Sequence, residues 1–145
     1  MRLLAAVLTP LLGLAAAMTA VGAAEPVPTP KTIFFATGST RGTVGGHVMR
    51  GARHLYALNA SAGQIMTVTI TAPDDNAVFQ IYEPGVSVAR DADGLLQFTG
   101  TALAHANEGD DATRWTGRLP HSGPYLIVVG STRGNARYSM DVKIE

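Results

Sequence analysis

The stretch from residue 54 to residue 71 constrains the fold of this chain more than any other. Apolar and polar residues alternate along its first part, and they alternate again after a short segment that contains Gly63. Successive side chains of an extended strand point to opposite faces, so this period of two predicts β-strands. We expect an antiparallel hairpin in which Gly63 adopts the positive φ of a tight connection. Because a two-stranded ribbon is not stable alone, other strands must cover its apolar face.

The rest of the chain predicts further short strands and no helix. No segment carries an apolar stripe of 3.6-residue period that is long enough for a helix. The expected strands, separated by turn-forming residues, are 33–36, 43–50, 77–82, 98–104, 114–119, 125–129 and 138–144. We expect Gly45 and Gly46 to interrupt the second of these as a bulge, and residues 86–111 to form a long loop with one irregular strand. Many short strands at this spacing predict an all-β fold, an antiparallel sandwich or a barrel.

The first 24 residues are typical of a secretory signal peptide. Arg2 precedes an uncharged apolar run over residues 3–14, and small residues follow as far as Ala24. The run contains Pro10 and lacks the flanks of a permanent membrane span. We expect cleavage after residue 24, an extended leader over residues 25–31, and one domain over residues 32–145. The position after cleavage is not a cysteine, so we expect a periplasmic or secreted protein without a membrane anchor.

Composition excludes several classes of protein. The chain has no cysteine, so packing rather than disulfides must stabilise it. It has 11 basic and 11 acidic residues, and this balance argues against a general binder of nucleic acid or membrane surfaces. The charges are unevenly distributed, with acids concentrated over residues 83–111 and bases after residue 112. This asymmetry allows one acidic loop and one basic edge on the same small domain.

A set of residues, taken in order, resembles the periplasmic inhibitors of goose-type (g-type) lysozyme. The set comprises Phe35, Gly38, Gly51, Tyr56, Leu58, Ala60, Gly63, Gln64, Glu83, Pro84, Gly85, Trp115, Gly117, Leu119, Pro120, Ser122, Gly123, Tyr125, Arg133 and Arg137. More loosely, the chain is similar to the β-sandwich domains that follow bacterial secreted peptidases. The resemblance implies an antiparallel β-sandwich of about eight strands that plugs the cleft of a g-type lysozyme, with no catalysis and no cofactor of its own.

The resemblance also implies which residues meet the lysozyme. Ser122, Gly123 and Tyr125 match the S-G-(x)-x-Y loop that enters the enzyme cleft in such inhibitors, where the serine hydroxyl can hydrogen-bond a catalytic carboxyl. The alternative is an ordinary turn, with Tyr125 as the first core residue of a strand.

Arg133 and Arg137 match a second signature of the family, a pair of arginines after the penultimate strand. Guanidinium groups are natural partners for the carboxylates of a lysozyme cleft. The alternatives are a solvated loop and, for Arg137, a place at the start of the last strand. On the inhibitor hypothesis, Ser122, Tyr125, Arg133 and Arg137 line one end of the sandwich.

Enzymatic and metal sites have no comparable signal. No nucleophile-elbow pattern surrounds Ser122, and the four histidines lack metal-ligand spacing. We therefore expect no enzyme, no metal and no cofactor. The second hypothesis is an exported accessory module that binds peptidoglycan or another envelope polymer.

Overall fold

The computed structural model describes residue 22 and residues 24–145, so nearly all of the expected signal peptide lies outside the described residues. The described part contains ten strands and no helix. The strands are β1 (Lys31–Thr32), β2 (Arg41–Val48), β3 (His54–Ala60), β4 (Ile65–Thr71), β5 (Ala77–Tyr82), β6 (Ser87–Arg90), β7 (Leu96–Thr99), β8 (Arg114–Arg118), β9 (Gly123–Ser131) and β10 (Ala136–Ile144). Accordingly, no helix of the described part is long and apolar enough to cross a membrane.

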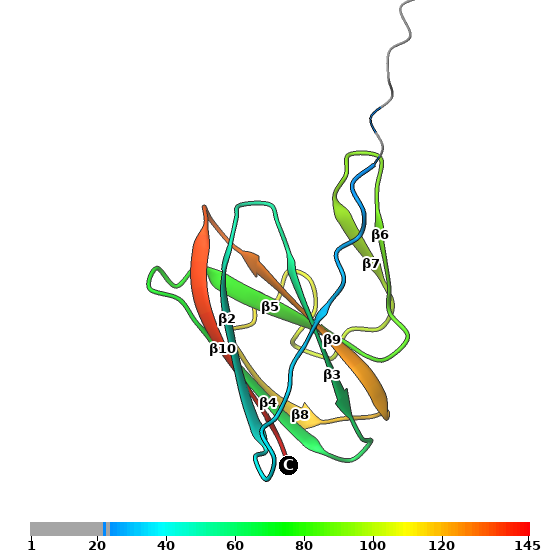
Figure 1. Cartoon of the computed structure of the whole chain (residues 1–145), viewed down its shortest axis with the longest axis vertical. Coiled ribbons are helices and arrows are strands. Elements are labelled where there is room, and N and C mark those ends of the chain that lie inside the picture. The colour runs from blue at the N-terminus through cyan, green and yellow to red at the C-terminus, as the bar shows by residue number, and fades with distance from the viewer. Residues whose placement is uncertain (1–21, 23) are drawn as a thin grey trace, which may run out of the picture.

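Two four-stranded sheets form a sandwich, and a separate hairpin stands beside it (Figure 1). The first sheet has the order β1-β3-β9-β5 and the second has the order β2-β10-β4-β8. Every pairing is antiparallel except that of β1 with β3. The all-β sandwich that we predicted is therefore confirmed.

The main core lies between the two four-stranded sheets. Burial alternates along β10, where Met140 and Val142 point inward, and it alternates in the same way along β4. Phe79 and Ile127 face them from the other sheet within the same cluster. Each such side chain contributes about 1.5–3 kcal/mol when it is fully buried, so this core is the main stabilising feature of a chain that has no cysteine.

The predicted hairpin over residues 54–71 is wrong, although its two strands are correct. β3 pairs with β9 and β4 pairs with β10, so the two strands belong to different sheets. Residues 61–64 connect the sheets, and Gly63 has the expected positive φ of 89°. The inner faces of both sheets carry the same alternation, so the pattern identifies an apolar face without identifying the neighbouring strand.

The long loop predicted over residues 86–111 contains a hairpin instead. β6 pairs with β7 and covers the outer face of the first sheet, where Tyr82, Leu126 and Val128 are buried. Phe98 of β7 stacks on Tyr82, with 5.4 Å between the ring centroids. The strand predicted over residues 98–104 therefore begins earlier and ends at Thr99. Because β9 is covered on both faces, its run of apolar residues is continuous.

The first two predicted strands also need correction. Residues 33–36 are not a strand, although the Ile33 amide still donates to the Ala57 carbonyl at 2.9 Å. β2 pairs with β10 in unbroken register through Gly45 and Gly46, so the expected bulge is absent. A Cβ atom on either glycine would lie 3.0 Å from an oxygen atom of Tyr138. These glycines therefore permit a close approach to Tyr138 rather than interrupting the strand.

The N-terminal segment runs along the β6–β7 hairpin (Figure 1). The Arg90 guanidinium donates to the Glu25 carbonyl at 3.0 Å and to the Gly94 carbonyl at 2.7 Å. One arginine thus holds the expected leader against the turn that joins β6 to β7, and the leader reaches the first sheet at Lys31.

Candidate functional site

The residues proposed from the sequence lie at both ends of β9 rather than on one rim. Ser122 immediately precedes this nine-residue strand and Arg133 follows it. At about 3.3 Å per residue, the strand separates the two by roughly 30 Å. The expectation that Ser122, Tyr125, Arg133 and Arg137 line one end of the sandwich is therefore wrong.

At the first end, the Ser122 hydroxyl is used within the fold. Its Oγ accepts a hydrogen bond from the Ala62 amide at 2.8 Å and so ties the β8–β9 turn to the β3–β4 connection. Gly123 has a φ of 140°, and a Cβ atom there would lie 3.0 Å from Pro84. A side chain at residue 123 would therefore strain the turn and collide with Pro84 in the loop between β5 and β6.

Tyr125 supports this turn from beneath. The residue is fully buried. Its hydroxyl donates to the His121 carbonyl at 2.7 Å and accepts from the His121 amide at 3.1 Å. Tyr125 is therefore the first core residue of its strand, as the alternative interpretation had it. In this turn Pro120, His121, Ser122 and Pro124 are exposed, and His121 Nε2 lies 3.6 Å from Glu83.

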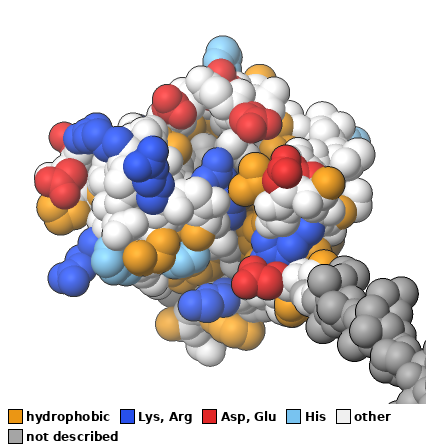
Figure 2. All heavy atoms as spheres, turned by 90° about the horizontal axis from the view of Figure 1, so that it is seen from above, with side chains coloured by type: hydrophobic (Ala, Val, Ile, Leu, Met, Phe, Trp, Pro, Cys, Tyr) orange, Lys and Arg blue, Asp and Glu red, His pale blue; other side chains and the backbone are white. Residues whose placement is uncertain are grey.

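At the other end, the β2–β3 and β9–β10 loops meet around a hollow of about 460 Å³. Arg50 and Arg53 of the β2–β3 loop and Arg133 of the β9–β10 loop line it. Arg137 is the second residue of β10, three residues beyond Gly134, and its exposed side chain lines a different hollow beside Thr71 and Pro73. We call Arg50, Arg133 and Arg137 the arginine end. Seen from above, several Lys and Arg side chains show on this face, one of them set back near its middle (Figure 2).

Asn76 fastens these loops together. It is the buried polar residue of the described part, and its side-chain amide donates to the carbonyls of Arg133 and Asn135, both at 3.0 Å. The Asn135 side chain in turn accepts from the Arg50 amide at 2.8 Å. The Arg133 guanidinium donates to the Asp74 carbonyl. The arginine end is therefore held by hydrogen bonds between side chains and backbone before any partner binds.

The guanidinium groups of the arginine end have no acidic partner among the described residues. The ion pairs among the described residues join Arg41 to Asp141, Arg90 to Glu25, His121 to Glu83 and Lys143 to Glu145. None of them involves Arg50, Arg133 or Arg137. These three guanidinium groups therefore remain available to carboxylates of a partner.

Sequence reasoning named Arg133 and Arg137 but missed Arg50, Arg53 and Asn76. The two arginines of the β2–β3 loop lie on either side of Gly51, whose φ is 79°. That local pattern predicts a turn, and nothing in it indicates that the turn meets a loop about 80 residues later in the chain. Asn76 directly follows a turn, and its burial depends on a long-range contact that no local pattern indicates.

A buried polar group joins the two sheets near this end. The Tyr138 hydroxyl of β10 lies 2.7 Å from His54 Nδ1 and within hydrogen-bond distance of the Tyr56 hydroxyl. Burial raises the pKa of Tyr138, and its hydrogen bond with Tyr56 raises it further. Burial, followed by the charges of Lys31 and His47, lowers the pKa of His54 below 6.5. The neutral forms of both rings are therefore favoured.

Comparison with solved structures shows where this architecture occurs. Aeromonas hydrophila PliG, a periplasmic lysozyme inhibitor of g-type lysozyme, has a TM-score of 0.62 and 31% sequence identity over 81% of this chain and 96% of its own. The chain belongs to the PliG family. PliG of Salmonella Typhimurium has a TM-score of 0.55 at 20% identity, with 82% of this chain and 100% of that one covered. A mutant PliG of Escherichia coli has a TM-score of 0.54 at 19% identity, with 81% and 100% covered.

The last two likenesses show the shared fold, and the family assignment rests on the first. No protein-family model matches the sequence, and a search of curated proteins finds no significant match. Within the described part of this PliG family member, no group of three or more metal-ligating side chains is close enough to hold a metal ion.

Proposed function

We propose that this protein is a periplasmic inhibitor of a g-type lysozyme and that its arginine end contacts the acidic groups of the lysozyme cleft. One observation carries the proposal: in a member of the PliG family, Arg50 and Arg133 stand on loops that Asn76 and Asn135 hold together, Arg137 follows at the start of β10, and none of the three has an acidic partner in the described part. The named relatives inhibit g-type lysozyme, and the same partner is proposed for this chain.

The chemistry of the partner suits this surface. Glycoside hydrolases of most families act through carboxyl groups that flank the bond to be cleaved. Guanidinium groups bind carboxylates with two parallel hydrogen bonds, and such pairs are strong where water is partly excluded. Loops already held in place lose little conformational entropy on docking. The arginine end therefore has the charge and the rigidity needed to occupy such a cleft without reacting there.

The turn at Ser122 is the rival contact surface, because it carries the pattern expected from the family. Ser122 and His121 are exposed, and Gly123 holds the turn in a fixed shape. Against this surface, the Ser122 hydroxyl already accepts the Ala62 amide and Tyr125 is buried. Both arguments favour a structural role for this end, so we assign the cleft contact to the arginine end.

A lysis assay with matched variants tests the assignment. The purified domain should slow the lysis of cell walls by a g-type lysozyme, and Arg133→Ala with Arg137→Ala should weaken the inhibition by about 10- to 100-fold. His121→Ala with Ser122→Ala should change it by less than about threefold. Arg114→Ala is the charge control, because Arg114 is exposed on β8 and has no ion pair in the described part.

Two results would contradict the proposal in different ways. If His121→Ala with Ser122→Ala abolished inhibition while Arg133→Ala with Arg137→Ala did not, the contact would lie at the other end of β9. No inhibition by the unaltered domain at micromolar concentration would remove the function itself, and retention of the domain on isolated cell wall without lysozyme would then support the peptidoglycan-binding alternative.

Export is a separate proposal. We infer that residues 1–24 direct the chain to the periplasm and are removed there. Expression of the full chain in a bacterium, followed by N-terminal sequencing of the periplasmic product, should give a protein that begins at Glu25. A full-length product in the cytoplasm would contradict it.

A further inference from the structure

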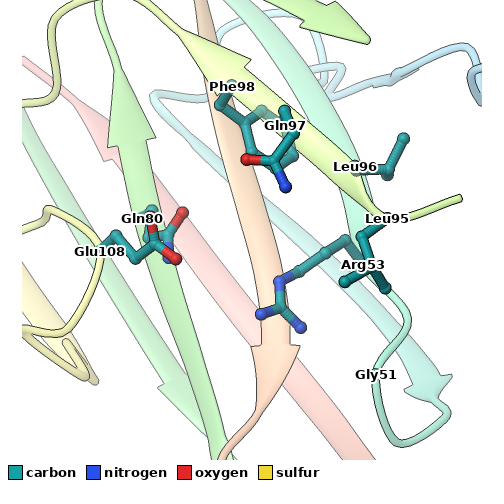
Figure 3. A pocket seen from close by; sticks show the side chains of 8 residues that line it. All are labelled: Gly51, Arg53, Gln80, Leu95, Leu96, Gln97, Phe98 and Glu108. Carbon is teal, nitrogen blue, oxygen red and sulfur yellow. The ribbon is translucent and has the colours of Figure 1, made fainter. Parts of the chain in front are cut away.

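A second hollow lies between the β6–β7 hairpin and the outer face of the first sheet. It has a volume of about 160 Å³. Figure 3 shows Arg53 reaching across β9 towards its centre, with Gln80 and Glu108 on the opposite side and Phe98 and Gln97 above. The hairpin creates this hollow, and none of the contacts proposed for lysozyme uses it.

Gly130 leaves room for the Arg53 guanidinium beside β9. A Cβ atom on residue 130 would lie 2.9 Å from Arg53 Nη1 and 3.1 Å from its Cζ. The guanidinium therefore lies against the backbone of β9 in space that only glycine leaves open. One of its hydrogen bonds goes to the Ala52 carbonyl at 3.1 Å. A guanidinium has five N–H donors, so further donors are available towards the hollow.

The opposite wall supplies a negative charge and a neutral amide. Glu108 lines the hollow, and it forms no ion pair with Arg53 or any other described residue. The Gln80 side-chain oxygen accepts the Tyr82 hydroxyl at 3.2 Å, which leaves the Gln80 NH₂ group available. Phe98 and Leu96 provide apolar surface beside these groups. A cation and an anion thus face the same small space without meeting each other.

We propose that this hollow binds a small zwitterion, an α-amino acid with a short side chain. The ligand carboxylate binds the Arg53 guanidinium and the Gln80 amide, the ammonium binds Glu108, and the side chain lies against Phe98. A simple anion would be attracted by Arg53 but repelled by Glu108. A simple cation would be attracted by Glu108 but repelled by Arg53. Only a ligand that carries both charges satisfies both walls.

Titration of the purified domain with alanine tests the proposal. Nuclear magnetic resonance should show the side-chain NH₂ signals of Gln80 and Gln97 moving with added alanine, with a dissociation constant in the millimolar range because so small a ligand has few atoms with which to bind. Acetate and ethylamine each carry one of the two charges, and they should bind at least tenfold more weakly. Equal shifts with all three compounds, or no shift with alanine at tens of millimolar, would overturn the proposal.

Variants locate the site. Glu108→Gln should weaken alanine binding at least tenfold, whereas Asp93→Asn, a change of the same kind at an exposed residue of the neighbouring turn, should not change it. Gly130→Ala keeps every charged residue but displaces the guanidinium, so it should abolish binding. A Glu108→Gln variant that binds alanine as the unaltered domain does would refute the assignment, whatever the effect of Gly130→Ala on folding.

Discussion

At the scale of single residues, Asn76 links the stability of the fold to the position of the arginines. Asn76→Ala leaves the carbonyls of Arg133 and Asn135 without their buried donor. We expect the free energy of unfolding to fall by about 1–3 kcal/mol, as measured by denaturant titration. Asn59→Ala is the control, because Asn59 is exposed on β3 and should change stability by less than about 0.5 kcal/mol.

Asn76 should also affect inhibition, and it should do so through Arg133. We expect Asn76→Ala to weaken lysozyme inhibition several-fold, because the β9–β10 loop then samples other positions. In an Arg133→Ala background the same change should weaken inhibition less, while its effect on unfolding remains. The same fold-loss of inhibition in both backgrounds would show that Asn76 does not position Arg133.

His54 gives the stability of the domain a dependence on pH. Its pKa is lowered below 6.5 in the folded protein by burial and by the charges of Lys31 and His47. The unfolded chain therefore takes up a proton more readily, so this contribution to stability is complete above about pH 6.5 and is lost as the pH falls towards the lower, folded pKa. The pKa values of Asp91 and Asp141 are lowered from 3.8 in the folded protein, so these carboxylates change the dependence of stability on pH only near and below pH 3.8.

Thermal unfolding at about pH 7.5 and about pH 5.5 checks this expectation. The midpoint of the unaltered domain should fall at the lower pH, and His54→Gln should show a smaller fall. His105→Asn should behave like the unaltered domain, because His105 is exposed and its φ of 68° suits asparagine. An unchanged fall in His54→Gln would place the pH dependence elsewhere.

At the scale of the strands, local alternation predicted most of the spans but not their neighbours. The prediction for 77–82 matches β5, and the two alternating parts of the stretch 54–71 correspond to β3 and β4, because the period of two is a property of each strand alone. The pairing of β3 with β9 joins segments far apart in the chain, and no local pattern identifies it. The β6–β7 hairpin was missed because each of its strands has only 4 residues, too few to show a clear period, and the acids and Gly94 lie in the turn between them.

The β6–β7 hairpin should contribute to stability as a third layer. Phe98→Ala removes the ring that stacks on Tyr82 and leaves part of the outer face of the first sheet uncovered. We expect a loss of about 2 kcal/mol, less than for a fully buried phenylalanine, by denaturant unfolding. Leu95→Ala in the same hairpin should cost less than about 0.5 kcal/mol, because Leu95 is 53% exposed. Equal effects of the two changes would show that the hairpin does not pack as a layer.

At the scale of the whole molecule, the direction of β9 decides which predicted site residues can act together. The sequence indicated both the Ser122 turn and the Arg133 loop, and both are turns in the structure. One strand of nine residues joins them, so they must lie at opposite ends of a sandwich that is one strand long. The prediction of a shared rim failed because it treated two motifs of one family as one surface without following the strand between them.

The distribution of charge over the whole molecule leads to a last prediction. The chain is neutral overall, so its total charge gives little attraction to an acidic cleft at long range. We expect the electrostatic attraction to come from the guanidinium groups of the arginine end, which have no acidic partner in the described part. We expect the association rate with a g-type lysozyme to fall as salt is raised from about 0.05 to 0.5 M, because the Debye length shortens from roughly 14 to 4 Å over that range.

Variants show which charges are responsible. The double variant Arg133→Ala with Arg137→Ala should associate more slowly at low salt, and its association rate should depend less on salt. Arg114→Ala should keep the salt dependence of the unaltered domain. Stopped-flow fluorescence measures both. If Arg114→Ala flattened the dependence as much as the double variant does, the attraction would come from charge spread over the surface, and the arginine end would lose its assigned role.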